Sequence, residues 1–165
     1  LKKLAICKGE FLMFGKGKKK ERANKIVDKI INDANELLET LKSKGYSVEI
    51  SKHKTECLLL GMQSFLISGF QQDYDLALEL VPSYQKKIMP FVTREEYSVL
   101  TKFLTDTYPE YRDIAIKVQF SSEQWQRTML EEFAKQTITY MGTANTYETV
   151  ETIVSFIALL YKNME

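Results

Sequence analysis

Two side chains with metal-binding chemistry stand four residues apart in the middle of the chain. His53 and Cys57 would lie on one face of a helix, and imidazole and thiolate are common ligands of Zn²⁺. A zinc site needs two more ligands, and the candidates are Cys7, Glu49 and Glu56. The competing interpretation is a surface histidine at a helix start and a buried cysteine on its apolar face. We expect this second arrangement, and therefore no metal and no cofactor.

The sequence contains few residues and motifs that are typical of enzyme active sites. The chain has one histidine, so any Ser-His-Asp or Cys-His nucleophile would have to use His53. The segment Gly15-Lys16-Gly17-Lys18 lacks P-loop spacing, and no Glu-x-x-His motif of di-iron bundles occurs. Two cysteines without a Cys-x-x-Cys motif indicate reduced thiols in a reducing compartment. We predict a cytoplasmic protein with no catalytic residues; an enzyme or a metal site at His53 is the third alternative.

Positive charge is concentrated at the start of the chain. Residues 1–20 carry a net charge of +6, whereas the remaining residues sum to −5, although the whole chain has a net charge of only +1. Such a segment could contact the phosphates of nucleic acid or of anionic lipid. The competing interpretation is a solvated terminus. The candidate contact residues are Lys16, Lys18, Lys19, Lys20, Arg22 and Lys25.

Three interpretations compete for the first residues. A secretory signal fails because no long apolar region or small-residue cleavage site follows the charges. A β-hairpin would pair residues 4–7 with residues 11–14 across a Gly-containing turn. Alternatively, residues 1–12 are not native: Leu1 would be a translated UUG codon, and residues 8–10 would translate a bacterial ribosome-binding site before Met13. The expected organisation is an N-terminal basic segment, 1–17, and a single helical domain, 18–165.

The body of the chain alternates helical patterns with caps and breakers. Apolar residues recur every three or four positions from residue 18 to 44, which is typical of an amphipathic helix. Residues 46–50 alternate as a short strand or form an extended connector. Further helices are expected over 52–70 and 74–81, after Thr93, from Pro109, after Ser121 and after Thr146, with breaks at Gly45, Pro82, Pro90 and Gly142. The pattern predicts an all-α fold, a compact antiparallel helical bundle of about six helices.

Composition and aromatic content indicate how such a bundle would work. With 165 residues, 44% hydrophobic and 27% charged, the chain suits one folded domain. Its longest apolar run, residues 57–70, is too short to cross a bilayer and is predicted to form a central helix. Nine tyrosines, many near predicted helix ends, suit partner surfaces. We predict a small bacterial or phage regulatory or adaptor protein that binds a protein partner, with homodimerisation through the first and last helices. Nucleic acid or an anionic membrane is the alternative partner.

Overall fold

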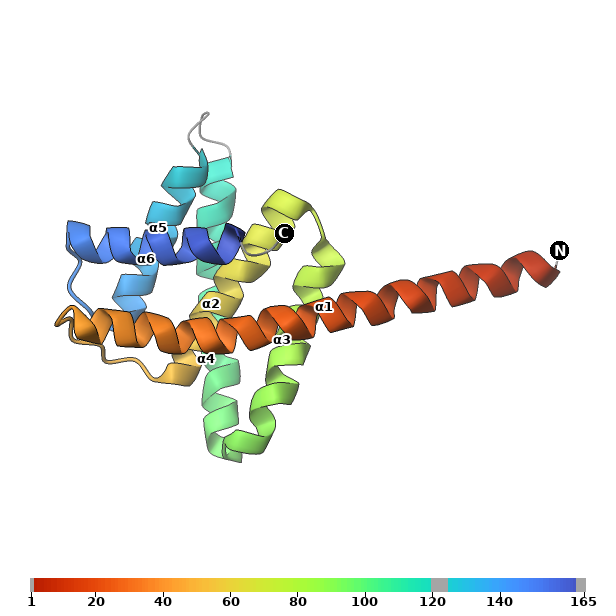
Figure 1. Cartoon of the computed structure of the whole chain (residues 1–165), viewed down its shortest axis with the longest axis horizontal. Helices are drawn as coiled ribbons and strands as arrows, with labels where there is room; N and C mark the ends of the chain where they lie inside the picture. Colours follow the sequence, from red (N-terminus) through yellow and green to blue (C-terminus); the bar gives the residue numbers. More distant parts are fainter. Residues whose placement is uncertain (1, 120–124, 163–165) are drawn as a thin grey trace.

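The chain folds into helices joined by short connections in the computed structural model. Residues 2–119 and 125–162 are described, with the side chains of residues 15, 17–118 and 126–160. The elements are α1 (Lys2–Ser43), α2 (Lys52–Leu66), the π-helix η1 (Ile67–Gln71), α3 (Tyr74–Ile88), the 3₁₀-helix η2 (Met89–Phe91), α4 (Arg94–Gln119), α5 (Trp125–Met141) and α6 (Tyr147–Lys162) (Figure 1). The predicted all-α bundle of about six helices is confirmed.

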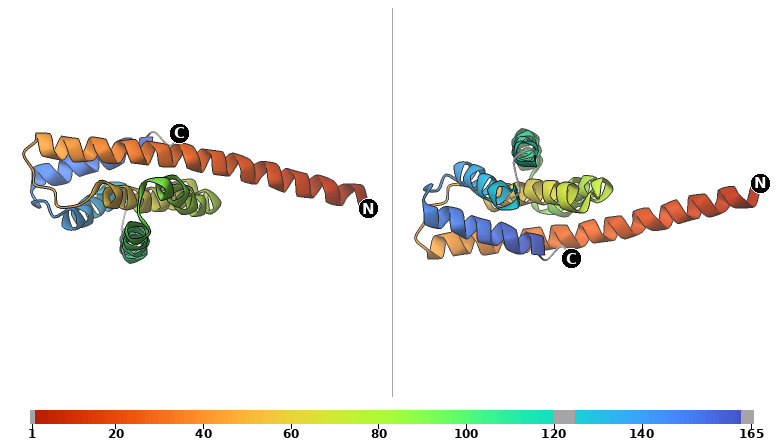
Figure 2. Two further views of the ribbon diagram at one scale, coloured as in Figure 1. Left: turned by 90° about the horizontal axis from the view of Figure 1, so that it is seen from below. Right: turned by 90° about the horizontal axis from the view of Figure 1, so that it is seen from above.

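The helices form three layers, which are seen edge-on in Figure 2. α1 and α6 make one outer layer, α2, α3 and α5 make the middle layer, and α4 crosses the other face alone. α1 packs mainly on α3 and α2, α6 packs mainly on α5, and α4 packs on α2 and α5. The N-terminal part of α1 extends past the other helices, so the chain begins far from the helical body (Figure 1).

α2 is the central helix of the bundle. Its consecutive residues Leu58, Leu59 and Leu60 are all fully buried, although neighbouring positions on a helix point in different directions. Such burial requires partners on every side, and α2 contacts each of the other five α-helices. The prediction that the apolar run forms a helix buried on most faces is therefore confirmed.

Most predicted helix starts and stops have the expected chemistry. Ser51 and Asp73 accept hydrogen bonds from backbone N–H groups three residues on, which caps α2 and α3. Thr93 forms the predicted capping box with a glutamate three residues on, and Thr146 caps α6. α1 and α5 are followed by glycines with positive φ, at Gly45 and Gly142.

The β interpretations of the sequence are wrong. Residues 4–14, which the hairpin would have used, belong to α1. The segment 46–50 is the extended connector, and no strand occurs among residues 2–119 and 125–162. A single strand needs a neighbour, and none remains once residues 4–14 are helical. The connector is instead attached to the end of α5, where the Glu49 N–H donates to the Met141 carbonyl at 3.0 Å.

Two prolines lie inside helices rather than at their ends. Pro82 was expected to break the third helix, but α3 continues to Ile88; Pro109 was expected to start a helix, but it lies within α4. Each proline lacks the N–H that would bond the carbonyl four residues before it in the helix. Both prolines are exposed, so water can donate to that carbonyl instead. Buried Tyr84 and Tyr111, just beyond them, hold the continued helices on the core. The start expected at residues 121–124 lies outside the described residues.

Candidate functional site

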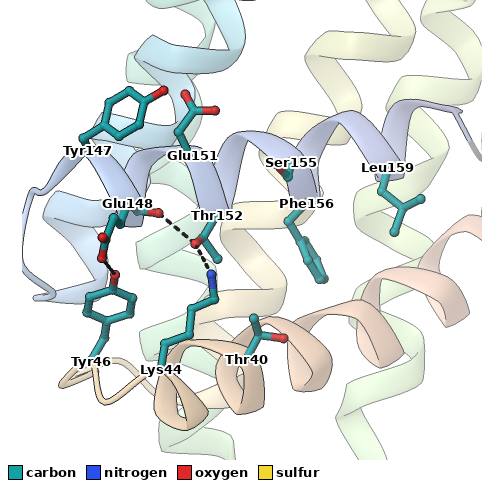
Figure 3. Close-up of a pocket in the computed structure, with 10 residues that line it drawn as sticks. All are labelled: Thr40, Lys44, Tyr46, Tyr147, Glu148, Glu151, Thr152, Ser155, Phe156 and Leu159. Atoms are coloured by element: carbon teal, nitrogen blue, oxygen red, sulfur yellow. Dashed lines mark hydrogen bonds between the residues drawn. The ribbon is translucent and has the colours of Figure 1, made fainter.

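An open groove of about 810 Å³ runs between the C-terminal half of α1 and α6 (Figure 3). Phe156 and Leu159 point from α6 toward α1, while Tyr147 stands at the start of α6 (Figure 3). The side chain of Tyr147 is 80% exposed and that of Leu159 is 49% exposed. The groove therefore offers aromatic and aliphatic surface that the chain itself does not cover.

Polar side chains join the two helices at one end of this groove. The Tyr46 hydroxyl donates to Glu148 at 3.1 Å, and the Lys44 ammonium donates to the Thr152 hydroxyl at 3.0 Å. Glu151, next to them, pairs with Arg127 of α5. Exposed contacts of this kind contribute little to stability, so they position the polar side chains at this end of the groove but do not hold it closed.

The predicted cationic residues are partly used inside the molecule. The Lys19 ammonium lies 2.9 Å from Asp75 and 3.1 Å from Asp73, and these two hydrogen bonds raise the pKa of Lys19. Arg22 donates to the side chain of Gln71 at 2.9 Å. These contacts attach α1 to the corner between η1 and α3 rather than presenting the cations to a ligand.

The rest of the predicted cationic set is more accessible. Lys25 pairs along α1 with Glu21 at 2.8 Å, and Lys18 and Lys20 are exposed. The side chain of Lys16 lies outside the described residues. A phosphate-binding surface here would therefore depend on Lys18 and Lys20 and could draw on Lys25.

Asp73 has two roles at this corner, because it caps α3 and also pairs with α1. Partial burial is the largest single influence on its pKa and raises it. Hydrogen bonds from Lys19 and from the Leu76 N–H, together with the charges of Lys19 and Arg22, outweigh that effect and leave the pKa of Asp73 lowered. The ionised form of Asp73 is therefore the one that stabilises the folded chain.

His53 and Cys57 face different surroundings in α2. The Nδ1 atom of His53 lies 2.9 Å from Glu56, whereas Cys57 is fully buried, with its thiol 3.8 Å from the Tyr84 hydroxyl. Burial raises the pKa of Cys57 to about 12, so the thiol is protonated at neutral pH when no metal is bound. Glu49, in the connector, lies beside Gly142 at the end of α5, and Cys7 has no described side chain. Within the described residues, no three His, Cys, Asp or Glu side chains are grouped to hold a metal ion.

A buried polar cluster surrounds Glu56 and was not predicted from the sequence. This carboxylate is 1% exposed; one oxygen accepts from the Tyr84 hydroxyl at 2.8 Å and faces His53. The other lies 3.6 Å from the Lys52 ammonium. Burial is the largest cause that raises the pKa of Tyr84, so its hydroxyl keeps its proton. The available signal was the position of Glu56, directly before the longest apolar run and three residues after the only histidine.

Comparison of the chain with family models, with curated proteins and with solved structures finds no match. None of the helices among the described residues combines the length and apolar character that a bilayer span requires. The geometry of the groove and of the polar cluster is thus the basis for a functional proposal.

Proposed function

We propose that the protein acts without catalysis, through protein–protein contacts, as a small cytoplasmic regulatory or adaptor protein of a bacterium or phage. The observation that carries this proposal is the α1–α6 groove, which exposes Tyr147 and Leu159 beside Phe156. Tyrosine, phenylalanine and other large apolar side chains are enriched where partners meet. The partner that we favour is a second copy of the chain.

Self-association is supported by the mixture of charges at the groove. Lys44 stands on the α1 side, and Glu148 and Glu151 stand on α6. In a two-fold contact the same surface meets itself, so a cation of one copy can face a carboxylate of the other. Apolar contact between Phe156 and Leu159 of the two copies would then form the centre of the interface.

The test is replacement of one exposed leucine of the groove by a charge. Leu159→Lys should weaken dimer formation by about tenfold or more, because a buried leucine contributes about 1.5–3 kcal/mol. Sedimentation equilibrium of the full chain measures the dissociation constant. Leu78→Lys is the matched control, since Leu78 is 74% exposed on α3, outside the groove. A monomeric wild-type chain, or equal weakening by both substitutions, would show that the groove is not a self-association surface.

The second candidate function is binding of nucleic acid or of an anionic membrane through the N-terminal cations. The exposure of Lys18 and Lys20 supports it, because both flank the residue that attaches α1 to the start of α3 and neither is covered by the helical body. We expect Lys18→Ala with Lys20→Ala to abolish any salt-sensitive binding to duplex DNA, RNA or anionic vesicles. Lys102→Ala on α4, which removes another exposed lysine, is the control. Absence of binding at low salt would exclude this function.

A further inference from the structure

A second cavity, of about 590 Å³, opens where α1 passes the start of α2 and the end of α3. Its apolar surface comes from Ile31, Ile88 and Phe91, and the Phe91 side chain is 81% exposed at the rim. Its polar surface includes Glu56 and His53 of α2. The cavity therefore joins an apolar wall to the buried carboxylate.

The carboxylate of Glu56 is incompletely satisfied. Its Oε2 atom accepts from Tyr84 and lies 2.9 Å from His53 Nδ1, whereas no described residue donates a hydrogen bond to Oε1. The nearest cation to Oε1 is the Lys52 ammonium at 3.6 Å, which is too long for a hydrogen bond, and the Lys52 side chain is 40% exposed. A buried carboxylate oxygen in this state favours a ligand that brings its own N–H donors.

The charge at the rim is compatible with a cation. Asp28 adds a second carboxylate to the cavity wall, and Lys87 is engaged by an ion pair with that residue. Among the residues with described side chains, Lys52 is the lysine within 4 Å of Glu56 that a ligand would have to displace, and its partial exposure lets the ammonium move into water.

We propose that this cavity binds a small organic amine, a primary ammonium on an aromatic or aliphatic body, with Glu56 as its counter-ion. The ammonium donates to Glu56 Oε1 in place of Lys52. The body of the ligand packs against Ile31, Ile88 and Phe91.

Three probes that share a phenyl ring but differ in charge test this proposal on the full chain. They are 2-phenylethylammonium, 3-phenylpropionate and 2-phenylethanol. His53 is the only histidine, so its imidazole proton signals in the NMR spectrum report on the cavity without ambiguity. We expect a saturable shift of these signals with the ammonium, and none with the other two probes.

Two substitutions separate the roles of the charges. Glu56→Gln should weaken binding of the ammonium by about thirtyfold or more, because it removes a buried counter-ion. Lys52→Met should tighten binding by about two- to fivefold, because it removes an exposed competing cation. Lys102→Met, on α4 and 76% exposed, should leave binding unchanged.

Several outcomes would overturn the proposal. Saturation by phenylpropionate with weaker binding in Lys52→Met would define an anion site. No saturable shift with the ammonium would show that the cavity has no amine ligand of this kind. Unchanged affinity of Glu56→Gln for the ammonium would show that Glu56 is not its counter-ion. If Glu56→Gln does not fold, two measurements still test the proposal: whether Lys52→Met tightens or weakens binding of the ammonium, and which of the three probes the wild-type chain binds.

Discussion

Replacement of Tyr84 by phenylalanine would remove one hydroxyl from the centre of the buried cluster and leave the ring in place. That hydroxyl donates to Glu56 at 2.8 Å and accepts from the Cys57 thiol at 3.8 Å, and all three side chains are at most 1% exposed. Tyr111 offers a matched comparison, because it is also fully buried but bonds the neutral Thr137 hydroxyl at 3.0 Å. The Tyr84 hydroxyl also lies 3.2 Å from the His53 carbonyl oxygen, and the two substitutions differ mainly in the charge of the hydroxyl's closest partner.

The expected magnitudes follow from that difference. A hydrogen bond to a charged group contributes about 1.5–3 kcal/mol, whereas a neutral one contributes about 0.5–1.5 kcal/mol. Tyr84→Phe also leaves a carboxylate oxygen with His53 alone. After Tyr111→Phe, by contrast, the Thr137 hydroxyl keeps its bond to the Phe133 carbonyl at 2.6 Å. We therefore expect Tyr84→Phe to lower the free energy of unfolding by about 1 kcal/mol more than Tyr111→Phe.

Urea unfolding at neutral pH, followed by far-ultraviolet circular dichroism, measures both losses on the same chain. The transition midpoints convert to free energies when the slopes of the two variants agree. Equal losses, or a larger loss in Tyr111→Phe, would refute the inference that the hydrogen bond from Tyr84 to Glu56 stabilises the fold more than a hydrogen bond between neutral groups does.

Three further predictions concern the scaffold. Gly61→Ala should cost about 1–3 kcal/mol of unfolding free energy, because the new methyl would lie 3.0 Å from the ring of Tyr111, whereas Gly69→Ala meets nothing within 4 Å and should not destabilise. Gly142→Ala, at a φ of +65°, should lower the stability by about 1–2 kcal/mol in the same urea assay. Asp73→Asn keeps the cap but loses the charge. Because the pKa of Asp73 is lowered in the folded chain, its charge stabilises the fold above about pH 4 and stabilises it less as the pH falls, so the stability of the variant should decrease less on acidification than that of the wild type. An unchanged dependence of stability on pH would contradict the pairing of Asp73 with Lys19.

Local chemistry in the sequence predicted where helices begin and end, but not where they continue. Ser51, Asp73 and Thr146 cap helices as expected, because a cap depends on residues within one turn. Pro82 and Pro109 mark no boundary, because packing of distant residues against the core outweighs the loss of one helical hydrogen bond. Tertiary contacts of this kind have no signature in a short window of sequence.

The candidate site was predictable only in part for the same reason. Periodicity placed His53 and Cys57 on one helix, but Glu56 becomes a buried hydrogen-bonded group only because α3 brings Tyr84 against it from 28 positions away. The cationic segment was visible as composition, yet the pairing of Lys19 with Asp73 and Asp75 depends on α1 passing the start of α3. Charge counts could not tell internal ion pairs from accessible cations.

The polar cluster is costly as a device for stability alone. Apolar side chains of similar volume at a buried ionic site are often as stable or more stable, since each ion loses its hydration on burial. The three leucines that follow in α2, Leu58, Leu59 and Leu60, are fully buried in all directions, whereas the other buried polar residues of α2, Thr55, Gln63 and Ser64, carry no charge. Glu56 departs from this pattern where α2 borders the cavity that it forms with α1 and the end of α3. We infer that this carboxylate serves a ligand in the cavity, because one of its oxygens receives no hydrogen bond from the described residues.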